Sequence, residues 1–123
     1  MGLTSLEICA GAGGQALGLE QAGFEHTCLV EIEKAACETL RLNRPNWKVL
    51  EQDVRNFFAR DLQGVDLLAG GVPCPPFSKA GKQLGHTDER DLFPEAIRLA
   101  SECLPRAVMM ILLALVSSIM GTL

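Results

Sequence analysis

The 123-residue sequence has no Cys-x-x-Cys pair, although it contains five cysteines. An odd number of cysteines without such a pair disfavours a complete disulfide framework and a zinc ribbon, and it indicates a reducing compartment. The N-terminus also lacks a basic segment leading into an apolar stretch. We therefore expect no secretory signal, and a cytoplasmic location is the default.

An excess of basic residues is missing as well. Fifteen acidic residues against 11 basic ones give a net charge of −4 and an isoelectric point near 5.1. Any groups that neutralise DNA phosphates must therefore be local, or must lie on a part outside this sequence. A composition of 48% apolar and 21% charged residues argues against a disordered tail, and the length suits one domain with a single core.

Strand-like and helix-like segments alternate along the chain. We predict strands over residues 3–9, 26–30, 48–51 and 65–69 and from residue 107, and helices over residues 15–22, 34–43, 54–60 and 92–104. Gly23 suits a left-handed cap, and Pro45 prevents the second helix from continuing. The alternation predicts an α/β fold with an open, mainly parallel, Rossmann-like sheet and helices on both faces. We expect the last helix to bury the stripe Phe93, Ala96, Ile97, Ala100 and Leu104.

Charged residues are absent from the final stretch, Ala107 to Leu123. A buried fifth strand needs only about five or six such residues, whereas a membrane span needs about 20. This favours a buried strand followed by an apolar tail over a membrane anchor.

A glycine-rich turn follows the first predicted strand. The pattern Gly11-x-Gly13-x-x-Ala16 permits a tight turn and lets backbone N–H groups approach a ligand at a helix N-terminus, although it also suits a turn that only packs strand on helix. Glu31 ends the second strand, where a carboxylate can bind ribose hydroxyls, and Asp53 follows the third. Each acid has a plainer alternative as a solvated residue or, for Asp53, a helix cap. Together they predict a nucleoside cofactor, without separating a nicotinamide dinucleotide from S-adenosylmethionine.

Cys74 lies in a loop after the fourth predicted strand, between Pro73 and Pro75. The flanking prolines restrict the backbone and would hold the thiol in one direction, which suits a nucleophile; the alternative is an inert cysteine. The other four cysteines, Cys9, Cys28, Cys37 and Cys103, are expected to be inert core residues.

Three motifs together resemble the DNA cytosine-5 methyltransferase family. The segment Gly71-Val72-Pro73-Cys74-Pro75-Pro76-Phe77-Ser78 is similar to the family's Pro-Cys nucleophile motif, with Pro75 where Gln is usual. The segment Ile8-Cys9-Ala10-Gly11-Ala12-Gly13-Gly14 resembles its first motif, with Cys9 where Phe is usual. Gly81-Lys82-Gln83 and Asp88-Glu89-Arg90 match its loop after the nucleophile. The resemblance runs over residues 4–110.

The resemblance implies that S-adenosylmethionine binds in the glycine turn. Glu31 would bind the ribose, Asp53 and Val54 would lie near the adenine, and Ile32 would pack on the purine face. The implied cofactor residues are Cys9, Ala10, Gly11, Gly13, Gly14, Glu31, Ile32, Asp53, Val54 and Pro73.

The implied reaction is methylation of cytosine in double-stranded DNA, without a metal. The target base leaves the stack, the Cys74 thiolate adds to C6, and C5 becomes nucleophilic enough to take the methyl group. Loss of the C5 proton and of the thiolate then restores the ring. Ser78, Lys82 and Arg90 would serve loop closure on DNA, although Arg90 has an alternative as an ordinary surface ion-pair partner.

The resemblance stops after Met110, where the family's Glu-Asn-Val motif is replaced by Ile111-Leu112-Leu113. We expect residues 1–110 to be the cofactor-binding and nucleophile half of a catalytic domain, and residues 111–123 to be an unrelated apolar tail from a truncation or frameshift. The chain alone is expected to be inactive and poorly soluble. The alternatives are a non-catalytic cofactor-binding remnant and, on the glycine pattern alone, a nicotinamide-dependent oxidoreductase.

Overall fold

A computed structural model describes residues 2–72 and 91–111. In chain order its elements are β1 (Leu3–Ile8), α1 (Gly14–Gln21), β2 (Phe24–Glu31), α2 (Lys34–Asn43), β3 (Val49–Glu51), the short 3₁₀ turns η1 (Val54–Asn56) and η2 (Arg60–Leu62), β4 (Leu67–Gly70), α3 (Phe93–Cys103) and β5 (Ala107–Met110). Helices and strands therefore alternate as predicted.

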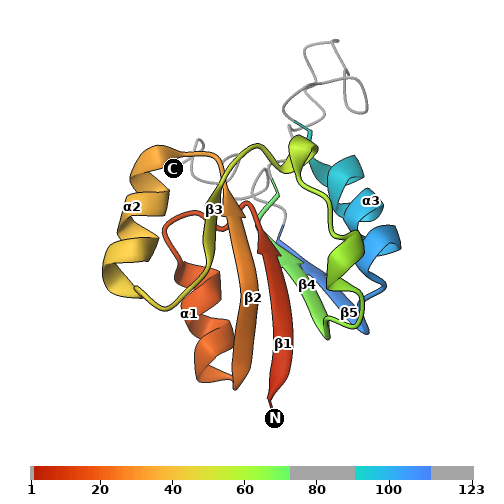
Figure 1. Ribbon diagram of the computed structural model, residues 1–123, viewed down its shortest axis with the longest axis horizontal. Coiled ribbons are helices and arrows are strands. Elements are labelled where there is room, and N and C mark those ends of the chain that lie inside the picture. Colours follow the sequence, from red (N-terminus) through yellow and green to blue (C-terminus); the bar gives the residue numbers. More distant parts are fainter. Residues whose placement is uncertain (1, 73–90, 112–123) are drawn as a thin grey trace, which may run out of the picture.

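The strands form one five-stranded sheet in the order β3-β2-β1-β4-β5, and every described pair of neighbours is parallel. Helices α1 and α2 lie on one face of this sheet and α3 on the other (Figure 1). The predicted fold class, an open parallel sheet with helices on both faces, is confirmed. Because the strands are parallel, the loops after β1, β2, β3 and β4 leave the sheet at the same edge.

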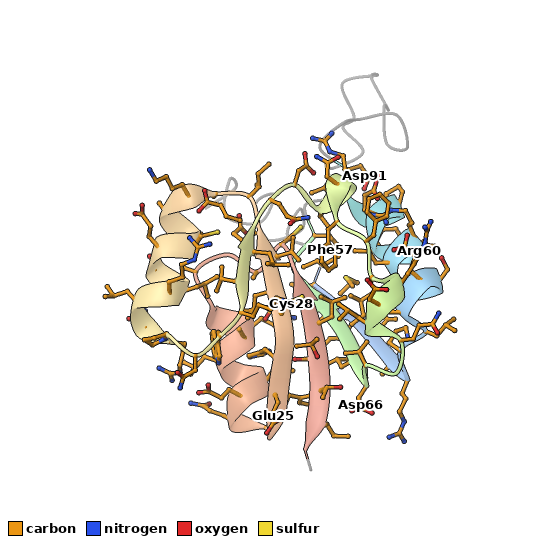
Figure 2. The ribbon with its side chains drawn as sticks, viewed as in Figure 1. Glu25, Cys28, Phe57, Arg60, Asp66 and Asp91 are labelled. Carbon is orange, nitrogen blue, oxygen red and sulfur yellow. The ribbon has the colours of Figure 1, made fainter. Side chains whose placement is uncertain are left out.

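The main core lies between the sheet and α3. Alternate residues of the central strands, such as Leu6 and Ile8 of β1, point into it and meet Leu99 of α3. Cys28 and Phe57, labelled in Figure 2, belong to the same buried cluster. Two smaller clusters lie on the opposite face of the sheet, where Leu40 of α2 and Leu19 of α1 are buried.

One arginine connects α3 to the segment after β3. The Arg98 guanidinium donates hydrogen bonds to the backbone carbonyls of Val54 and Phe57, at 3.1 and 2.8 Å, and pairs with Glu102 at 2.7 Å. Glu102 in turn accepts a hydrogen bond from the backbone N–H of Ala59 at 2.8 Å. This network holds the chain that follows β3 in place without a regular helix.

Two sequence predictions need correction. The helix expected over residues 54–60 is instead the two 3₁₀ turns η1 and η2, because the backbone between them is fixed by Arg98 and Glu102. The predicted buried stripe of α3 is only partly correct, because, of its five residues, only Ala96 is buried and Ala100 packs against the core. The helix buries Ala96, Leu99 and Cys103, whereas Phe93, Ile97 and Leu104 of the stripe are exposed.

The turn at Gly23 is as expected. Gly23 follows the last residues of α1 with a φ of 97°, a left-handed conformation that glycine adopts without steric cost. Helix α2 occupies the predicted residues, Lys34–Asn43, and Pro45 follows its end.

Candidate functional site

The loop between β1 and α1 turns sharply at its glycines. Gly11 and Gly13 have φ values of 61° and 107°, in the region that favours glycine, and Cys9 has a φ of 50°. A Cβ on Gly13 would lie 2.8 Å from Leu40 Cδ2, whereas a Cβ on Gly11 or Gly14 would meet no atom within 4 Å. The loop thus packs closely on α2 at Gly13 and has free space beside Gly11 and Gly14.

Glu31 ties this loop to the end of β2. Its Oε1 accepts a hydrogen bond from the Gly11 backbone N–H at 2.8 Å, and its Oε2 accepts one from the Glu33 backbone N–H at 2.9 Å. A carboxylate has about four acceptor positions, so these two bonds leave capacity for hydroxyl donors. Ile32 is the next residue in the sequence. Its surface is 63% exposed, so an apolar side chain is accessible directly after Glu31.

Asp53 follows β3 and caps the N-terminus of the 3₁₀ turn η1. Its Oδ1 accepts a hydrogen bond from the Arg55 backbone N–H at 2.9 Å, and its Oδ2 pairs with the Arg55 guanidinium at 2.8 Å. These bonds hold the pKa of the Asp53 carboxyl below its usual range. The plainer alternative for Asp53, a cap, is therefore present in the structure. Val54, the other residue expected near the adenine, is buried in the main core.

Burial and the carboxylates of Glu31 and Asp53 affect the pKa of the half-buried Cys9 thiol. Burial, followed by the negative charges of Glu31 and Asp53, raises the pKa of Cys9 to about 12. A neutral thiol between two acids is not a nucleophile, and here it behaves as a small apolar side chain. Ala10, the next residue, is buried against the α2 side of the sheet.

These residues meet at the carboxyl ends of three neighbouring strands, β1, β2 and β3 (Figure 1). The glycine loop, Glu31, Ile32 and Asp53 therefore share one edge of the sheet, as their places in the sequence predicted. Five of the predicted residues, Pro73, Cys74, Ser78, Lys82 and Arg90, lie outside the described residues. The strand before them, β4, is next to β1 and runs parallel to it.

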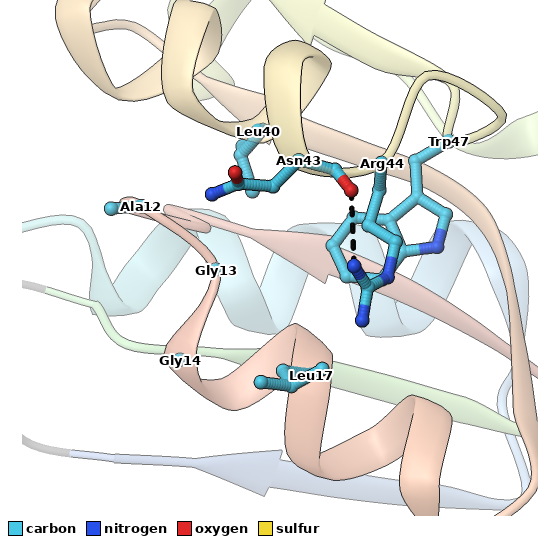
Figure 3. A pocket seen from close by; sticks show the side chains of 8 residues that line it. All are labelled: Ala12, Gly13, Gly14, Leu17, Leu40, Asn43, Arg44 and Trp47. Carbon is cyan, nitrogen blue, oxygen red and sulfur yellow. Dashed lines mark hydrogen bonds between the residues drawn. The ribbon is translucent and has the colours of Figure 1, made fainter.

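A cavity of about 340 Å³ lies beside the glycine loop, between the start of α1 and the end of α2 (Figure 3). Its lining includes Gly13, Gly14, Arg44 and Trp47 but neither Glu31 nor Asp53. Glu20 binds two residues that line the cavity. Its carboxylate pairs with Arg44 Nε at 3.1 Å and accepts a hydrogen bond from Trp47 Nε1 at 3.1 Å. Sequence reasoning did not predict this cavity, and the single tryptophan is the only signal that pointed to it.

Sequence reasoning also missed the acid at the centre of the sheet. Glu7 of β1 is fully buried, and neither of its carboxyl oxygens has a hydrogen-bond partner among the described residues. Burial raises its pKa to about 8. Its position as the one charged residue of β1, two residues before Cys9, is the signal that the sequence offered.

Within residues 2–72 and 91–111, no helix has the length and apolar composition of a membrane span. In the same ranges, no three His, Cys, Asp or Glu residues gather as ligands for a metal ion.

Comparison with known sequences connects this arrangement to one family. Residues 3–110 match the family model described as C-5 cytosine-specific DNA methylase. The chain is 73% identical over 110 residues to the type II methyltransferase M.NgoMIV of Neisseria gonorrhoeae, covering 89% of this chain and 35% of that protein. It is 54% identical over 111 residues to the type II methyltransferase M.NaeI of Lentzea aerocolonigenes, covering 88% of this chain and 27% of that protein. The chain thus spans about a third or less of these curated relatives.

Solved structures share the same fold. A candidate DNA modification methyltransferase encoded within an E. coli prophage superposes with a TM-score of 0.72 at 28% identity, covering 98% of this chain and 36% of the other. The DNMT2 protein of Spodoptera frugiperda superposes with a TM-score of 0.68 over 88% of this chain and 34% of its own, and at 24% identity this likeness concerns the fold alone.

Proposed function

Because the chain belongs to the C-5 cytosine-specific DNA methylase family, we propose that it supplies the cofactor site and the nucleophile of a DNA (cytosine-5-)-methyltransferase. The observation that carries this proposal is the meeting of the glycine loop, Glu31 and Asp53 at one edge of the parallel sheet, where such sheets bind ligands. The type II methyltransferases among the relatives suggest a role in restriction–modification in the cytoplasm.

The cofactor that we propose is S-adenosylmethionine, which supplies a methyl group when bound. The described residues fit it in three respects. Space is free beside Gly11 and Gly14, the Glu31 carboxylate keeps acceptor capacity for ribose hydroxyls, and the exposed Ile32 offers an apolar surface to a purine. In this proposal Cys9, Ala10 and Gly13 belong to the turn that holds the cofactor, and Asp53 and Val54, which follow β3, lie toward its adenine.

Cys74 is the proposed nucleophile. Its thiolate adds to C6 of a cytosine flipped out of double-stranded DNA, which makes C5 nucleophilic enough to accept a methyl group. Loss of the C5 proton and expulsion of the thiolate restore the aromatic ring. Pro73 restricts the backbone before the thiol, and Ser78, Lys82 and Arg90 serve the loop on DNA. The support comes from β4, which runs parallel beside β1, so the chain after β4 leaves the sheet at the edge of the glycine loop.

The experiment has two parts. Binding of S-adenosylmethionine is measured by calorimetry for wild type, Glu31→Ala and the control Glu33→Ala, which removes a neighbouring exposed carboxylate. We expect Glu31→Ala to weaken binding by about tenfold or more, since it removes charge-assisted hydrogen bonds to the ligand and to Gly11. Equal affinity of the two variants, or preferred binding of a nicotinamide dinucleotide, would contradict the cofactor assignment.

Trapping tests the nucleophile. This chain is mixed with the segment of a relative that follows the matched stretch. DNA containing 5-fluorocytosine and cofactor are added, and the covalent adduct is resolved on a denaturing gel. Cys74→Ala is expected to keep cofactor affinity and abolish the adduct, whereas Cys37→Ala, at a buried thiol, keeps it. An adduct that survives Cys74→Ala rules out Cys74 as the nucleophile.

A second candidate, a cofactor-binding chain without catalytic activity of its own, is favoured by one observation. Ile111-Leu112-Leu113 follow β5, and none of residues 103–123 is an aspartate or glutamate that could protonate the base during attack at C6. This candidate predicts cofactor binding but no transfer of labelled methyl to cytosine by the pure 123-residue polypeptide.

A further inference from the structure

Arg98 of α3 makes two kinds of contact. Within the helix it pairs with Glu95 at 2.6 Å and with Glu102 at 2.7 Å, three residues before it and four after it. Pairs at these spacings form on the surface of a helix that has no tertiary contacts. Its Nη2, however, also donates hydrogen bonds to the backbone carbonyls of Val54 and Phe57, 44 and 41 residues away in sequence. This second kind of contact joins α3 to the segment that follows β3.

That segment, residues 53–59, has little regular structure of its own. Its backbone hydrogen bonds in the turn η1 are local. The Asn56 N–H donates to the Asp53 carbonyl at 2.9 Å, and the Phe57 N–H donates to the Val54 carbonyl at 3.1 Å. A 3₁₀ turn has poorer hydrogen-bond geometry than an α-helix. The position of the segment therefore depends on its contacts with the rest of the molecule.

Helix α3 supplies such contacts. Val54 and Phe57 bury their side chains in the main core, between the sheet and α3. Arg98 binds the carbonyls of these same two residues, so each is held through its side chain and through its backbone. Farther along, the Ala59 N–H donates to Glu102, the ion-pair partner of Arg98, at 2.8 Å.

The guanidinium group of Arg98 suits this task because all three of its nitrogens are used. Nε binds Glu95, Nη1 binds Glu102, and Nη2 binds the two carbonyls. A planar guanidinium has five donors in a fixed arrangement, whereas a lysine ammonium concentrates its three donors on one atom. The positive charge of Arg98 is also balanced by two carboxylates on its own helix, which favours a bracing role over binding of an external anion.

The braced segment begins at the candidate cofactor site. Asp53, one of the two residues assigned to the adenine, caps η1 and directly precedes Val54. The Val54 carbonyl accepts two hydrogen bonds, one from the Phe57 N–H and one from Arg98, at 3.1 Å each. Loss of Arg98 would therefore free the backbone directly after Asp53 and leave its carboxylate less well oriented, although Arg98 itself need not touch the cofactor.

We propose that Arg98 is a positioning residue for the adenine of the cofactor. By fixing the backbone after Asp53, it sets how well the site distinguishes adenine from a base that lacks the exocyclic amine. This amine is a hydrogen-bond donor, and the Asp53 carboxylate is an acceptor. The inference rests on the proposed function, because that function assigns the adenine to Asp53 and Val54.

The test compares two ligands, S-adenosylhomocysteine and S-inosylhomocysteine, which carries a carbonyl in place of the adenine amine. Calorimetry measures their affinities for the full 123-residue chain. We expect the wild type to prefer the adenine ligand. In Arg98→Ala the ratio of the two affinities should fall by about tenfold, since the hydrogen bond between the amine and Asp53 is lost. Most of the loss should fall on the adenine ligand.

Arg98→Lys keeps the positive charge beside Glu95 and Glu102 but cannot reproduce the set of hydrogen bonds that the guanidinium makes. It should give a ratio between those of the wild type and Arg98→Ala. This variant also decides the question if Arg98→Ala does not fold.

Two controls separate positioning from general effects. Arg106→Ala removes an arginine whose side chain is 78% exposed, just before β5. Leu67→Ala truncates a buried leucine of β4 on the face of the sheet opposite α3, which lowers stability without touching residues 53–59. Both variants should keep the wild-type ratio of affinities.

The inference is overturned if Arg98→Ala lowers both affinities by the same factor, if it leaves the ratio unchanged, or if Leu67→Ala changes the ratio as much. A wild type that binds both ligands equally would also overturn it, while the cofactor assignment would stand. A wild type that binds neither ligand would refute the proposed function, and this inference with it.

Discussion

At the residue scale, Glu7 is the most unusual side chain of the described fold. A carboxyl buried in the central strand without a partner is disfavoured in its charged form, which is why its pKa rises from 4.5 to about 8. The unfolded chain ionises near pH 4.5 while the native state stays protonated. The contribution of Glu7 to stability is therefore most favourable below pH 4.5 and is lost as the pH rises toward 8.

We predict that Glu7→Gln removes this pH dependence. Between pH 5 and 8 the wild type should lose up to about 1.4 kcal/mol of unfolding free energy per pH unit, and the variant should lose far less. Urea unfolding at several pH values measures the difference. Glu25→Gln on the neighbouring strand, where the side chain is exposed, serves as the control and should follow the wild type. A wild-type slope in Glu7→Gln would show that Glu7 does not titrate as proposed.

Gly13 and Gly18 give a matched pair of glycines in one loop–helix unit. Gly13→Ala forces a side chain into a φ of 107° and against the buried Leu40, and it should cost about 1–3 kcal/mol. Gly18→Ala lies inside α1 with no atom within 4 Å of the new Cβ, and it should stabilise by about 0.5–1 kcal/mol. Thermal unfolding compares the two; a neutral Gly13→Ala would mean that the turn relaxes freely.

At the element scale, periodicity predicted where helices and strands lie better than which way they face. Helix α2 occupies its predicted residues because polar residues surround a narrow apolar side. Helix α3 lies where it was predicted, but its buried side was only partly predicted. Its apolar arc is wide enough to hold two faces, and the spacing of residues 93, 97 and 104 is as regular as that of 96, 99 and 103. Only the packing against the sheet decides which of the two faces is covered.

The candidate site was predictable to the extent that it depends on strand order. The acids at the ends of β2 and β3 fall beside the glycine loop because parallel neighbours end at one edge. The bond from Gly11 to Glu31 and the pairing of Asp53 with Arg55 depend on loop geometry that no residue pattern encodes. The cavity beside Trp47 likewise comes from the approach of two helices distant in sequence.

Two truncations on α3 test the corrected orientation. Leu99→Ala should lower the unfolding free energy by about 3–5 kcal/mol, because Leu99 is fully buried and its removal leaves a cavity. Ile97→Ala, two residues earlier and mostly exposed, should change it by less than about 0.5 kcal/mol. Chemical denaturation measures both. The reverse order of costs would restore the original prediction of the buried stripe.

At the scale of the whole molecule, the two edges of the sheet differ in what they expose. The candidate cofactor site uses the half formed by β3, β2 and β1, whereas the exposed apolar residues Val108 and Met109 lie on β5, beyond β4 at the other edge. Substitutions at these two residues should therefore leave cofactor affinity unchanged.

The β5 edge also governs how the chain behaves in solution. Unpaired backbone groups flanked by Val108 and Met109 form a template for further strands, so we predict concentration-dependent association. Met109→Lys places a charge on that edge and should slow the growth of light scattering several-fold, whereas Leu42→Lys adds the same charge on α2 and should not. Because both variants change the net charge equally, a matching effect would assign the association to overall charge, and a specific effect of Met109→Lys would assign it to β5.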